Sequence, residues 1–262
     1  MPVTNLLPLP RLAALILLLF ARPLLAGQTQ VAVAANFSQT MQRIVEDFQQ
    51  QSGHRVGLSF GSSGKFYAQI RQGAPFEVLL SADSEKPAAL EKAGLTVNGQ
   101  RFTYAMGTLA LWSALDNISV QGADILSGGD FNRLALANPR LAPYGLAAMQ
   151  VLDTLKLTQL TRHKWVLGEN IGQTYQFVAT GNAELGFVAL SQLLARNIPS
   201  DQYWQIPATL HQPIRQDAVL LSTGRNNPAA IQLLAFLQGE KARRTIREHG
   251  YTLPPEKPAV QP

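Results

Sequence analysis

The sequence predicts an α/β fold in which crossover helices connect the strands of parallel sheets. Short apolar or β-branched runs alternate with helical patterns along the chain, and this alternation favours such a fold over an all-α or all-β domain. The hydrophobic content of 46% is enough for extensive cores, and the 262-residue length accommodates one large domain or two smaller lobes. No internal repeat is visible.

The N-terminus has the pattern of a secretory signal peptide. An uncharged apolar run from Leu12 to Phe20 follows Arg11, and Ala26 offers a small residue for cleavage. The run is much shorter than the ~20 residues that span a bilayer. We therefore expect residues 1–26 to be removed on export. Because the chain contains no cysteine, it offers no lipid anchor, disulfide or thiolate metal site.

Seven strands are predicted from the short apolar runs. They are Gln30–Ala35, Arg55–Gly61, Val78–Ser81, Thr108–Trp112, Arg133–Ala137, Leu185–Ala189 and Ala218–Ser222. Three helices are indicated by apolar residues at helical spacing. Their stripes are Phe37, Met41, Ile44, Val45 and Phe48, ended by Gly53; Leu146, Met149, Leu152 and Leu155; and Ile231, Leu234, Phe236 and Leu237, in a helix from Pro228 to Gly250. The proline-rich residues 251–262 are expected to be disordered.

The charge balance does not favour a nucleic-acid partner. The formal net charge of +5 includes Arg11 and Arg22; without them, 20 Lys and Arg residues oppose 17 Asp and Glu residues. The basic cluster near the C-terminus lies beside Glu240 and Glu248 on a predicted helix, which is typical of a solvated helix face.

Three predicted strand-to-helix junctions are rich in small polar residues. Asn36 follows the first strand at or near a helix N-cap, where the simplest role of its side chain is to accept a hydrogen bond from the helix backbone. Ser62 and Ser63 follow the second strand directly, and Pro143-Tyr144-Gly145 opens a helix after a later strand. Helix N-termini carry unpaired N–H groups and partial positive charge. Three such junctions predict an anion site made of neutral donors.

Other site chemistries fit the sequence less well. The run from Gly61 to Lys65 lacks the four-residue insert of a phosphate-binding P-loop and has Phe66 where that loop needs Ser or Thr. The same run is one residue short of a serine-hydrolase elbow. The four histidines, His54, His163, His211 and His249, have no metal-ligand spacing. Nucleotide binding, covalent catalysis and cation binding are therefore the weaker interpretations.

At its junctions the chain resembles the periplasmic molybdate-binding proteins of molybdate ABC transporters. The resemblance rests on Ala34 to Phe37, Phe60 to Ser63, Gln69 to Pro75, Leu80 to Asp83, Leu134 to Pro139 with Pro143 to Gly145, Gly186 to Val188, and Gly250-Tyr251. It implies a two-lobed type II solute-binding fold, each lobe a mixed, mostly parallel sheet flanked by helices. Lobe I would comprise residues 27–109 and 216–250, and lobe II residues 110–215.

The resemblance also implies the residues that bind the oxyanion. The family's donors correspond to Asn36 and Ser63 in lobe I and to Tyr144 and the backbone N–H of Ile171 in lobe II, with Ala35 and Ser62 as further candidates. Some members place a tyrosine where this chain has Ala189, so Tyr144 would supply that hydroxyl.

The function implied is that of a periplasmic, monomeric, non-enzymatic carrier. It would need no cofactor, hold molybdate or tungstate between the lobes, and deliver it to a membrane permease. Neutral donors would reject hydrogen phosphate, whose proton needs an acceptor.

Three alternatives stay open on the sequence alone. The same fold could bind sulfate, phosphate or an organic acid. An enzyme could use Ser62 or Ser63 with a nearby base. The sensing half of a transcription regulator would need an N-terminal helix-turn-helix, where this chain has its export signal.

Overall fold

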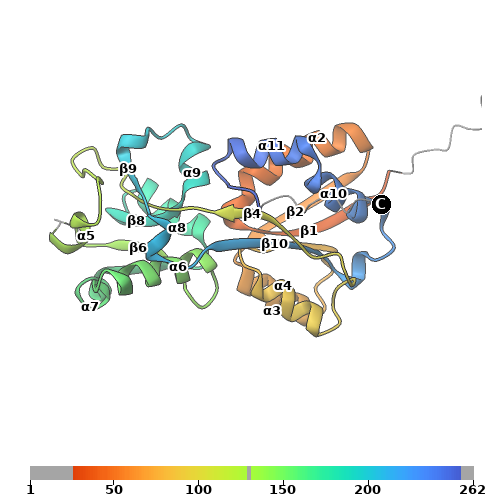
Figure 1. Ribbon diagram of the computed structural model, residues 1–262, viewed down its shortest axis with the longest axis horizontal. Coiled ribbons are helices and arrows are strands. Elements are labelled where there is room, and N and C mark those ends of the chain that lie inside the picture. Colours follow the sequence, from red (N-terminus) through yellow and green to blue (C-terminus); the bar gives the residue numbers. More distant parts are fainter. Residues whose placement is uncertain (1–25, 129–130, 255–262) are drawn as a thin grey trace, which may run out of the picture.

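Two α/β lobes make up the computed structural model, which describes residues 26–128 and 131–254 (Figure 1). Each lobe contains a five-stranded sheet with helices on both faces. Apart from Ala26, the predicted signal peptide lies outside the described residues.

The first sheet has the strand order β2-β1-β3-β10-β4. Its strands are β1 (Gln28–Ala34), β2 (Arg55–Gly61), β3 (Val78–Leu80), β4 (Phe102–Gly107) and β10 (Ile214–Leu220). Strands β2 and β3 run parallel to β1, whereas β10 runs antiparallel to both of its neighbours. The helices of this lobe are η1 (Ala35–Phe37), α2 (Ser38–Ser52), α3 (Ser63–Arg71), α4 (Glu85–Lys92), η5 (Ser222–Gly224), α10 (Pro228–Gln238) and α11 (Glu240–Glu248).

The second sheet repeats this pattern in the order β7-β6-β8-β5-β9. Its strands are β5 (Leu109–Trp112), β6 (Leu134–Ala137), β7 (Trp165–Gly168), β8 (Leu185–Ala189) and β9 (Tyr203–Gln205). Here β6 is parallel to β7 and β8, and β5 is the antiparallel strand. The helices are α5 (Asp124–Gly128), α6 (Pro143–Thr154), α7 (Thr158–Thr161), η2 (Arg162–Lys164), α8 (Ile171–Ala179), α9 (Leu190–Leu194), η3 (Ser200–Gln202) and η4 (Ala208–Leu210). Both sheets are therefore mixed and mostly parallel, as predicted.

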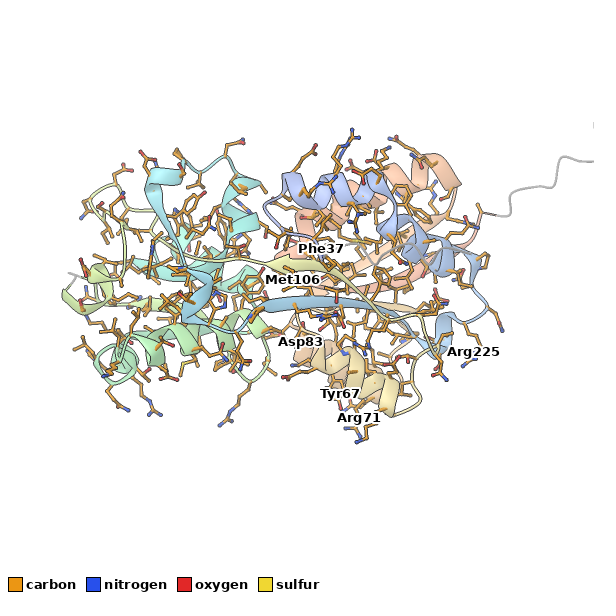
Figure 2. All side chains as sticks on the ribbon, viewed as in Figure 1. Phe37, Tyr67, Arg71, Asp83, Met106 and Arg225 are labelled. Carbon is orange, nitrogen blue, oxygen red and sulfur yellow. The ribbon has the colours of Figure 1, made fainter. Side chains whose placement is uncertain are left out.

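Strand alternation places a hydrophobic core on each face of the first sheet. Val31 and Val33 of β1 face α2, α10 and α11, whereas Ala32 faces α3 and α4. The predicted stripe from Phe37 to Phe48 is buried in the first of these cores. Figure 2 shows Phe37 inside this lobe and Arg71 at its outer edge.

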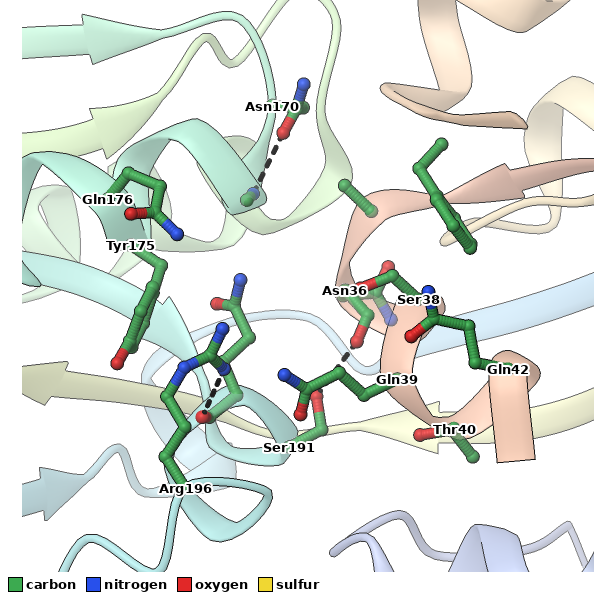
Figure 3. A pocket seen from close by; sticks show the side chains of 14 residues that line it. Asn36, Ser38, Gln39, Thr40, Gln42, Asn170, Tyr175, Gln176, Ser191 and Arg196 are labelled. Carbon is green, nitrogen blue, oxygen red and sulfur yellow. Dashed lines mark hydrogen bonds between the residues drawn. The ribbon is translucent and has the colours of Figure 1, made fainter. Parts of the chain in front are cut away.

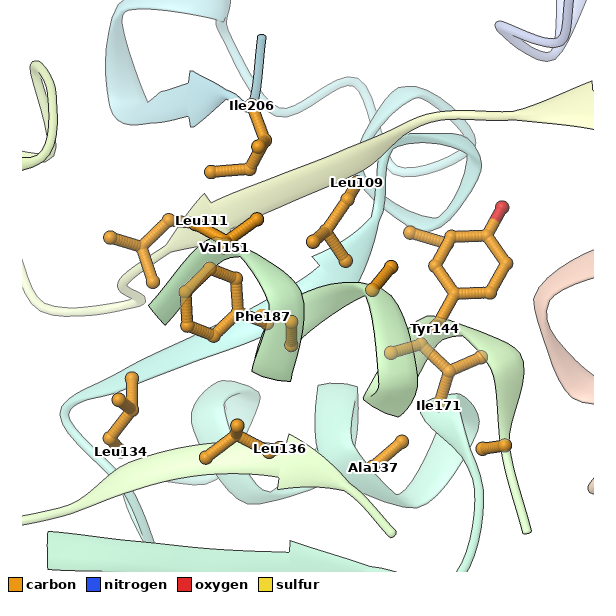
Figure 4. Close-up of a cluster of buried hydrophobic side chains, with 14 of the residues drawn as sticks. Leu109, Leu111, Leu134, Leu136, Ala137, Tyr144, Val151, Ile171, Phe187 and Ile206 are labelled. Atoms are coloured by element: carbon orange, nitrogen blue, oxygen red, sulfur yellow. The ribbon is translucent and has the colours of Figure 1, made fainter. Parts of the chain in front are cut away.

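The second lobe has the same two-core arrangement. Its larger core lies between the sheet and α6 and includes Leu109, Leu136 and Phe187 (Figure 4). The smaller core lies under α8 and α9 and includes Trp112, whose ring stacks on Tyr175 at 5.0 Å. In the described part of the chain, no helix is long and apolar enough to cross a membrane.

Three strands were absent from the sequence prediction, and each lies at the edge of a sheet. They are β4, β7 and β9. Edge strands bury less of their surface, and the residues of β7 and β9 are mostly half-buried or exposed. A short strand of this kind lacks the continuous apolar run that identified the central strands.

Gly53 ends α2 in the left-handed conformation, at φ 71°, as predicted. Three other helix predictions need correction. The helix predicted from Pro228 to Gly250 is instead interrupted at Gly239, whose extended backbone ends α10 and begins α11. Leu146 and Ile231, predicted to face the core, are exposed, because the alanines next to them let α6 and α10 pack closely on their sheets.

Residues 251–254, the described part of the predicted disordered tail, include two residues that pack against lobe I. Tyr251 is buried at 3% exposure and its ring packs edge-on against Phe37 at 5.2 Å. The backbone of Thr252 pairs with Met106 of β4. The tail prediction is therefore wrong at these two residues, and residues 255–262 lie outside the described range.

Two segments connect the sheets. The chain leaves the first sheet after Gly107 and enters the second at Leu109; it returns between Gln205 and Ile214. Leu109 pairs within the second sheet and Ile214 and Arg215 within the first, whereas the predicted boundaries placed Leu109 in lobe I and the other two in lobe II.

Candidate functional site

Four strand-to-helix junctions, with Ala82 from a fifth, surround one small cavity between the lobes. Its lining residues are Ala34, Ala35, Asn36, Gly61, Ser62, Ser63, Ala82, Ala142, Pro143, Tyr144, Asn170 and Ile171. All six residues predicted for the oxyanion site are among them. The structure therefore brings together every predicted site residue, drawn from both lobes.

Helix N-termini point the backbone of each junction at the cavity. Ser63, Pro143 and Ile171 are the first residues of α3, α6 and α8, and Ala35 begins η1. The first N–H groups of a helix have no acceptor within it. In the described part of the chain, the N–H groups of Ser63, Tyr144 and Ile171 make no backbone hydrogen bond. Such N–H groups attract anions because their hydrogens have no acceptor within the helix and the helix dipole is positive at this end.

Asn170 shows how one of these donors is kept free. Its side chain caps α8 by accepting hydrogen bonds from the N–H groups of Gly172 at 2.9 Å and Gln173 at 3.1 Å. The N–H of Ile171 lies outside this cap, and Ile171 lines the cavity. The cap therefore stabilises the helix without using the donor predicted to bind the ligand.

The two serines of the second junction have different partners. The N–H of Ala82 donates to Oγ of Ser63 at 2.9 Å, which leaves the hydroxyl proton of Ser63 for another acceptor. Oγ of Ser62 is buried and has no hydrogen-bond partner within the protein. An unpaired buried hydroxyl costs roughly 1–3 kcal/mol, so a ligand that accepts its proton would remove this cost.

Asn36 does not cap a helix, contrary to the simplest prediction. The helix α2 has Phe37 as its N-cap residue, and neither η1 nor α2 has a side-chain cap. Instead, Nδ2 of Asn36 donates to Oε1 of Gln216 at 2.8 Å and to Oη of Tyr251 at 3.1 Å. Its Oδ1 is buried without a partner. The side chain thus belongs to a buried polar network beside the cavity.

Tyr144 is held by apolar packing at one end and by this network at the other. Its ring is part of the large core of the second lobe, and its hydroxyl points out of that core (Figure 4). Nε2 of Gln216 donates to the Tyr144 hydroxyl at 3.3 Å. Burial raises the pKa of Tyr144 well above 10.0, so the hydroxyl keeps its proton and remains a donor.

The cavity contains no formal charge. None of its lining residues is Lys, Arg, His, Asp or Glu. Close to it, Nζ of Lys65 pairs with Oε1 of Glu169 at 2.7 Å across the lobes, so these two charges compensate each other. No cluster of three or more metal-ligating side chains occurs in the described residues. The lining residues also offer no base to activate Ser62 or Ser63 as a nucleophile.

The lobes are in direct contact around the cavity. The N–H of Gly64 donates to the carbonyl of Leu141 at 2.8 Å, and a Cβ at Gly64 would lie 3.0 Å from that backbone. Oγ of Ser191 donates to the carbonyl of Asn36 at 3.1 Å. The cavity volume is about 10 Å³, roughly one water-sized sphere. This is a closed arrangement, and an oxyanion with four oxygens needs the donors to move apart.

A wider groove lies beside the cavity and leads to solvent. Side chains of α2 face those of α8 and α9 across it (Figure 3). The Arg196 guanidinium stacks over the Tyr175 ring at 4.1 Å. The groove shares Ala35, Asn36 and Asn170 with the cavity, and one arginine lies at its wall.

Two residues that complete the site were missed by sequence reasoning. Gln216 is fully buried and contacts both Asn36 and Tyr144. Gly107 makes room for them, because a Cβ there would lie 2.3 Å from Oη of Tyr144 and 2.6 Å from Nε2 of Gln216. Neither lies at a strand-to-helix junction, so no local pattern identified them.

Comparison with known proteins shows close relatives over nearly the whole chain. Residues 29–252 match the family described as bacterial extracellular solute-binding protein. The chain is 52% identical to the molybdate-binding protein ModA of Azotobacter vinelandii, over 87% of this chain and 91% of the relative. It is 45% identical to ModA of Rhodobacter capsulatus, over 88% and 90%. The solved structure of the Azotobacter vinelandii periplasmic molybdate-binding protein superposes with a TM-score of 0.83 at 38% identity, covering 86% of this chain and 99% of that one.

Proposed function

The chain belongs to the bacterial extracellular solute-binding proteins, and we propose on this basis that it captures molybdate or tungstate between its lobes. The observation that carries the proposal is the uncharged cavity at which helix N-termini from both lobes meet. We further propose that the loaded protein delivers the anion to the permease of an ABC transporter. The relatives named molybdate-binding protein support this ligand over sulfate, phosphate or an organic acid.

In this proposal the donors act as fixed dipoles. Ser62 and Ser63 donate their hydroxyl protons, Ile171 donates its backbone N–H, and Tyr144 donates its N–H or hydroxyl. Asn36 and the backbone of Ala35 complete the lobe I side. Hydrogen bonds to a charged acceptor are about twice as strong as neutral ones. Several of them can hold a dianion without a lysine or arginine.

The same donors account for the expected selectivity. Molybdate and tungstate carry no proton at neutral pH and can accept from every side. Hydrogen phosphate has a proton that needs an acceptor, so it leaves a donor facing a donor. Sulfate has the same charge and shape as molybdate, so the distance between the lobes must decide between them.

Binding from both sides makes the anion a bridge that stabilises the closed form. Serine donors on α3 and the Ile171 donor on α8 move together only when the lobes close. A closed form differs in shape from an open one, and this difference is what a permease can recognise. We propose that the ligand-free protein exchanges in solution between an open form and the closed form seen here, so small-angle scattering should show compaction when molybdate shifts it to the closed form. An unchanged radius of gyration would contradict closure.

The proposed location is the periplasm, and the proposed working form is a monomer without enzymatic activity. The family description and the periplasmic relative support the location. The six site residues all come from one chain, which supports a monomeric site. Sedimentation of the mature chain with and without molybdate tests the oligomeric state.

A panel of oxyanions in a thermal-shift assay tests the ligand. A ligand at about a thousand times its Kd adds roughly 4 kcal/mol to the state that binds it. At about 2–4 °C per kcal/mol for a chain of this size, molybdate and tungstate should raise Tm by about 8 °C or more. Sulfate and phosphate should cause much smaller shifts. An equal or larger shift with sulfate, phosphate or an organic acid would assign the protein to that ligand instead.

A further inference from the structure

Gln216 lies between the side-chain donors of the two lobes. It belongs to β10 and is fully buried. Its Oε1 accepts from Nδ2 of Asn36 at 2.8 Å, and its Nε2 donates to Oη of Tyr144 at 3.3 Å. The hydroxyl of Tyr104 also donates to Oε1, at 3.0 Å. One amide group therefore acts as acceptor toward lobe I and as donor toward lobe II.

The strand is distorted where Gln216 lies. The pairing of β10 with β4 shifts register between Gln216 and Asp217. Such a bulge redirects a side chain and is common next to functional sites. The carboxylate of Asp217 is held elsewhere, by Arg101 at 2.8 Å and by the hydroxyl of Thr103 at 2.7 Å. Gln216 and Asp217 thus have separate partners, and the neutral side chain of the two is the one that contacts Asn36 and Tyr144.

These contacts determine which protons are available to an anion. Because Gln216 donates to Oη of Tyr144, the proton of that hydroxyl must point in another direction. Asn36 meanwhile gives its two amide protons to Gln216 and Tyr251, and its Oδ1 has no partner. This arrangement requires position 216 to accept from Asn36 and to donate to Tyr144 at once.

We propose that Gln216 is a positioning residue that directs the Tyr144 hydroxyl proton away from itself and so makes that hydroxyl a donor to the bound oxyanion. It does not touch the anion, since it is not among the residues that line the cavity. The inference rests on the proposed function and adds a residue outside the set that the resemblance implies.

Gln216→Glu tests this role with almost no change in shape. An ionised carboxylate can only accept, so it captures the Tyr144 proton and removes it from the anion. A protonated carboxyl has one C=O and one O–H, which reproduces the pattern of the amide. The hydroxyls of Tyr104 and Tyr144 contact Gln216, and that of Tyr251 contacts Asn36; burial raises the pKa of all three, so they stay protonated while the introduced carboxyl titrates. The carboxylates of Asp217, the next residue of the chain, and of Asp83 act electrostatically on Tyr104.

The experiment is molybdate calorimetry on the full mature chain between about pH 8 and pH 5, a range in which a buried carboxyl can gain its proton. Gln216→Glu should bind at least about tenfold more weakly than wild type at the upper pH, and should approach wild type at the lower pH. Gln216→Met, which neither charges the site nor forms the bridge, should be several-fold weaker at every pH. Gln69→Glu in α3, whose side chain does not line the cavity, is the matched control and should bind like wild type.

The outcomes separate the inference from the function on which it rests. If wild type does not bind molybdate, the proposed function is wrong. If wild type binds and Gln216→Met binds equally well, the carboxylate acts only by repulsion and the positioning role is rejected. If the loss of molybdate affinity in Gln216→Glu does not change with pH, the positioning role is also rejected. Thermal unfolding of each variant without ligand identifies any that fail to fold.

Discussion

Replacing Ser62 by alanine should change stability and affinity in opposite directions. Ser62 is 2% exposed, and its Oγ has no partner within the protein. A buried hydroxyl without a partner costs about 1–3 kcal/mol. Its removal should therefore stabilise the closed, ligand-free form by roughly 1 kcal/mol, at the lower end because a small void remains. This corresponds to a Tm increase of up to about 2–4 °C.

The same substitution should weaken molybdate binding. A hydrogen bond to a charged acceptor contributes about 1.5–3 kcal/mol, which corresponds to a roughly 10- to 150-fold increase in Kd. Differential scanning fluorimetry of the free protein and isothermal titration calorimetry with molybdate measure the two effects separately.

Ser63→Ala is the matched comparison. Oγ of Ser63 accepts from the N–H of Ala82, so its removal leaves a buried N–H without a partner. The variant should lose both stability and affinity. If Ser62→Ala lowers the Tm of the free protein, or binds molybdate as tightly as wild type, then the cavity does not use the Ser62 hydroxyl as described.

Three further predictions concern contacts of the closed arrangement. Gly107→Ala places a Cβ 2.3 Å from Oη of Tyr144, so it should raise the Kd for molybdate, measured by calorimetry, by about tenfold or more. The control Gly122→Ala, whose Cβ meets no atom within 4 Å, should leave the Kd unchanged. Equal affinities of the two variants would show that the contact at Gly107 is absent from the bound form. Lys65→Met removes an ion pair whose side chains are about half exposed, and because exposed pairs contribute little, the Kd should change by less than about fivefold, a larger change indicating that the lysine attracts the anion directly. Burial raises the pKa of Tyr251 from 10.0 to about 12, so its stabilisation is complete below pH 10 and is lost as pH rises toward 12; denaturant titrations of wild type and Tyr251→Phe should converge over that range, and parallel curves would contradict the shift.

The local part of the site could be predicted from sequence. Strands rich in Val, Leu and Ala identify themselves by short apolar runs, and the small polar residues that follow them identify helix starts. Ser62 and Ser63 come directly after β2, and Ile171 follows Asn170 at the start of α8. In a mostly parallel sheet the carboxyl ends of strands lie at one edge. Within each lobe, polar residues that directly follow parallel strands are therefore expected close together, and the short strand and helix patterns beside them are enough to predict this.

The contacts that organise the site depend on distant parts of the chain. Gln216 is 180 residues from Asn36, and Tyr251, expected in a disordered tail, donates to the carbonyl of Asn36 at 2.8 Å from 215 residues away. No periodicity or cap signal encodes such a pair. The Gln216 contact exists only when β10 lies beside β3 and β4, and the Tyr251 contact only when the segment after α11 returns to β4.

Fold class and junctions follow from patterns a few residues long, whereas the proposed donor residues were implied by the resemblance to a known family. The folded molecule was needed to show that the donors meet in one uncharged cavity, that Gly107 leaves space for them, and that a buried glutamine connects the two lobes. The direction of a hydrogen bond is set by both of its partners, and here the partners come from separate lobes.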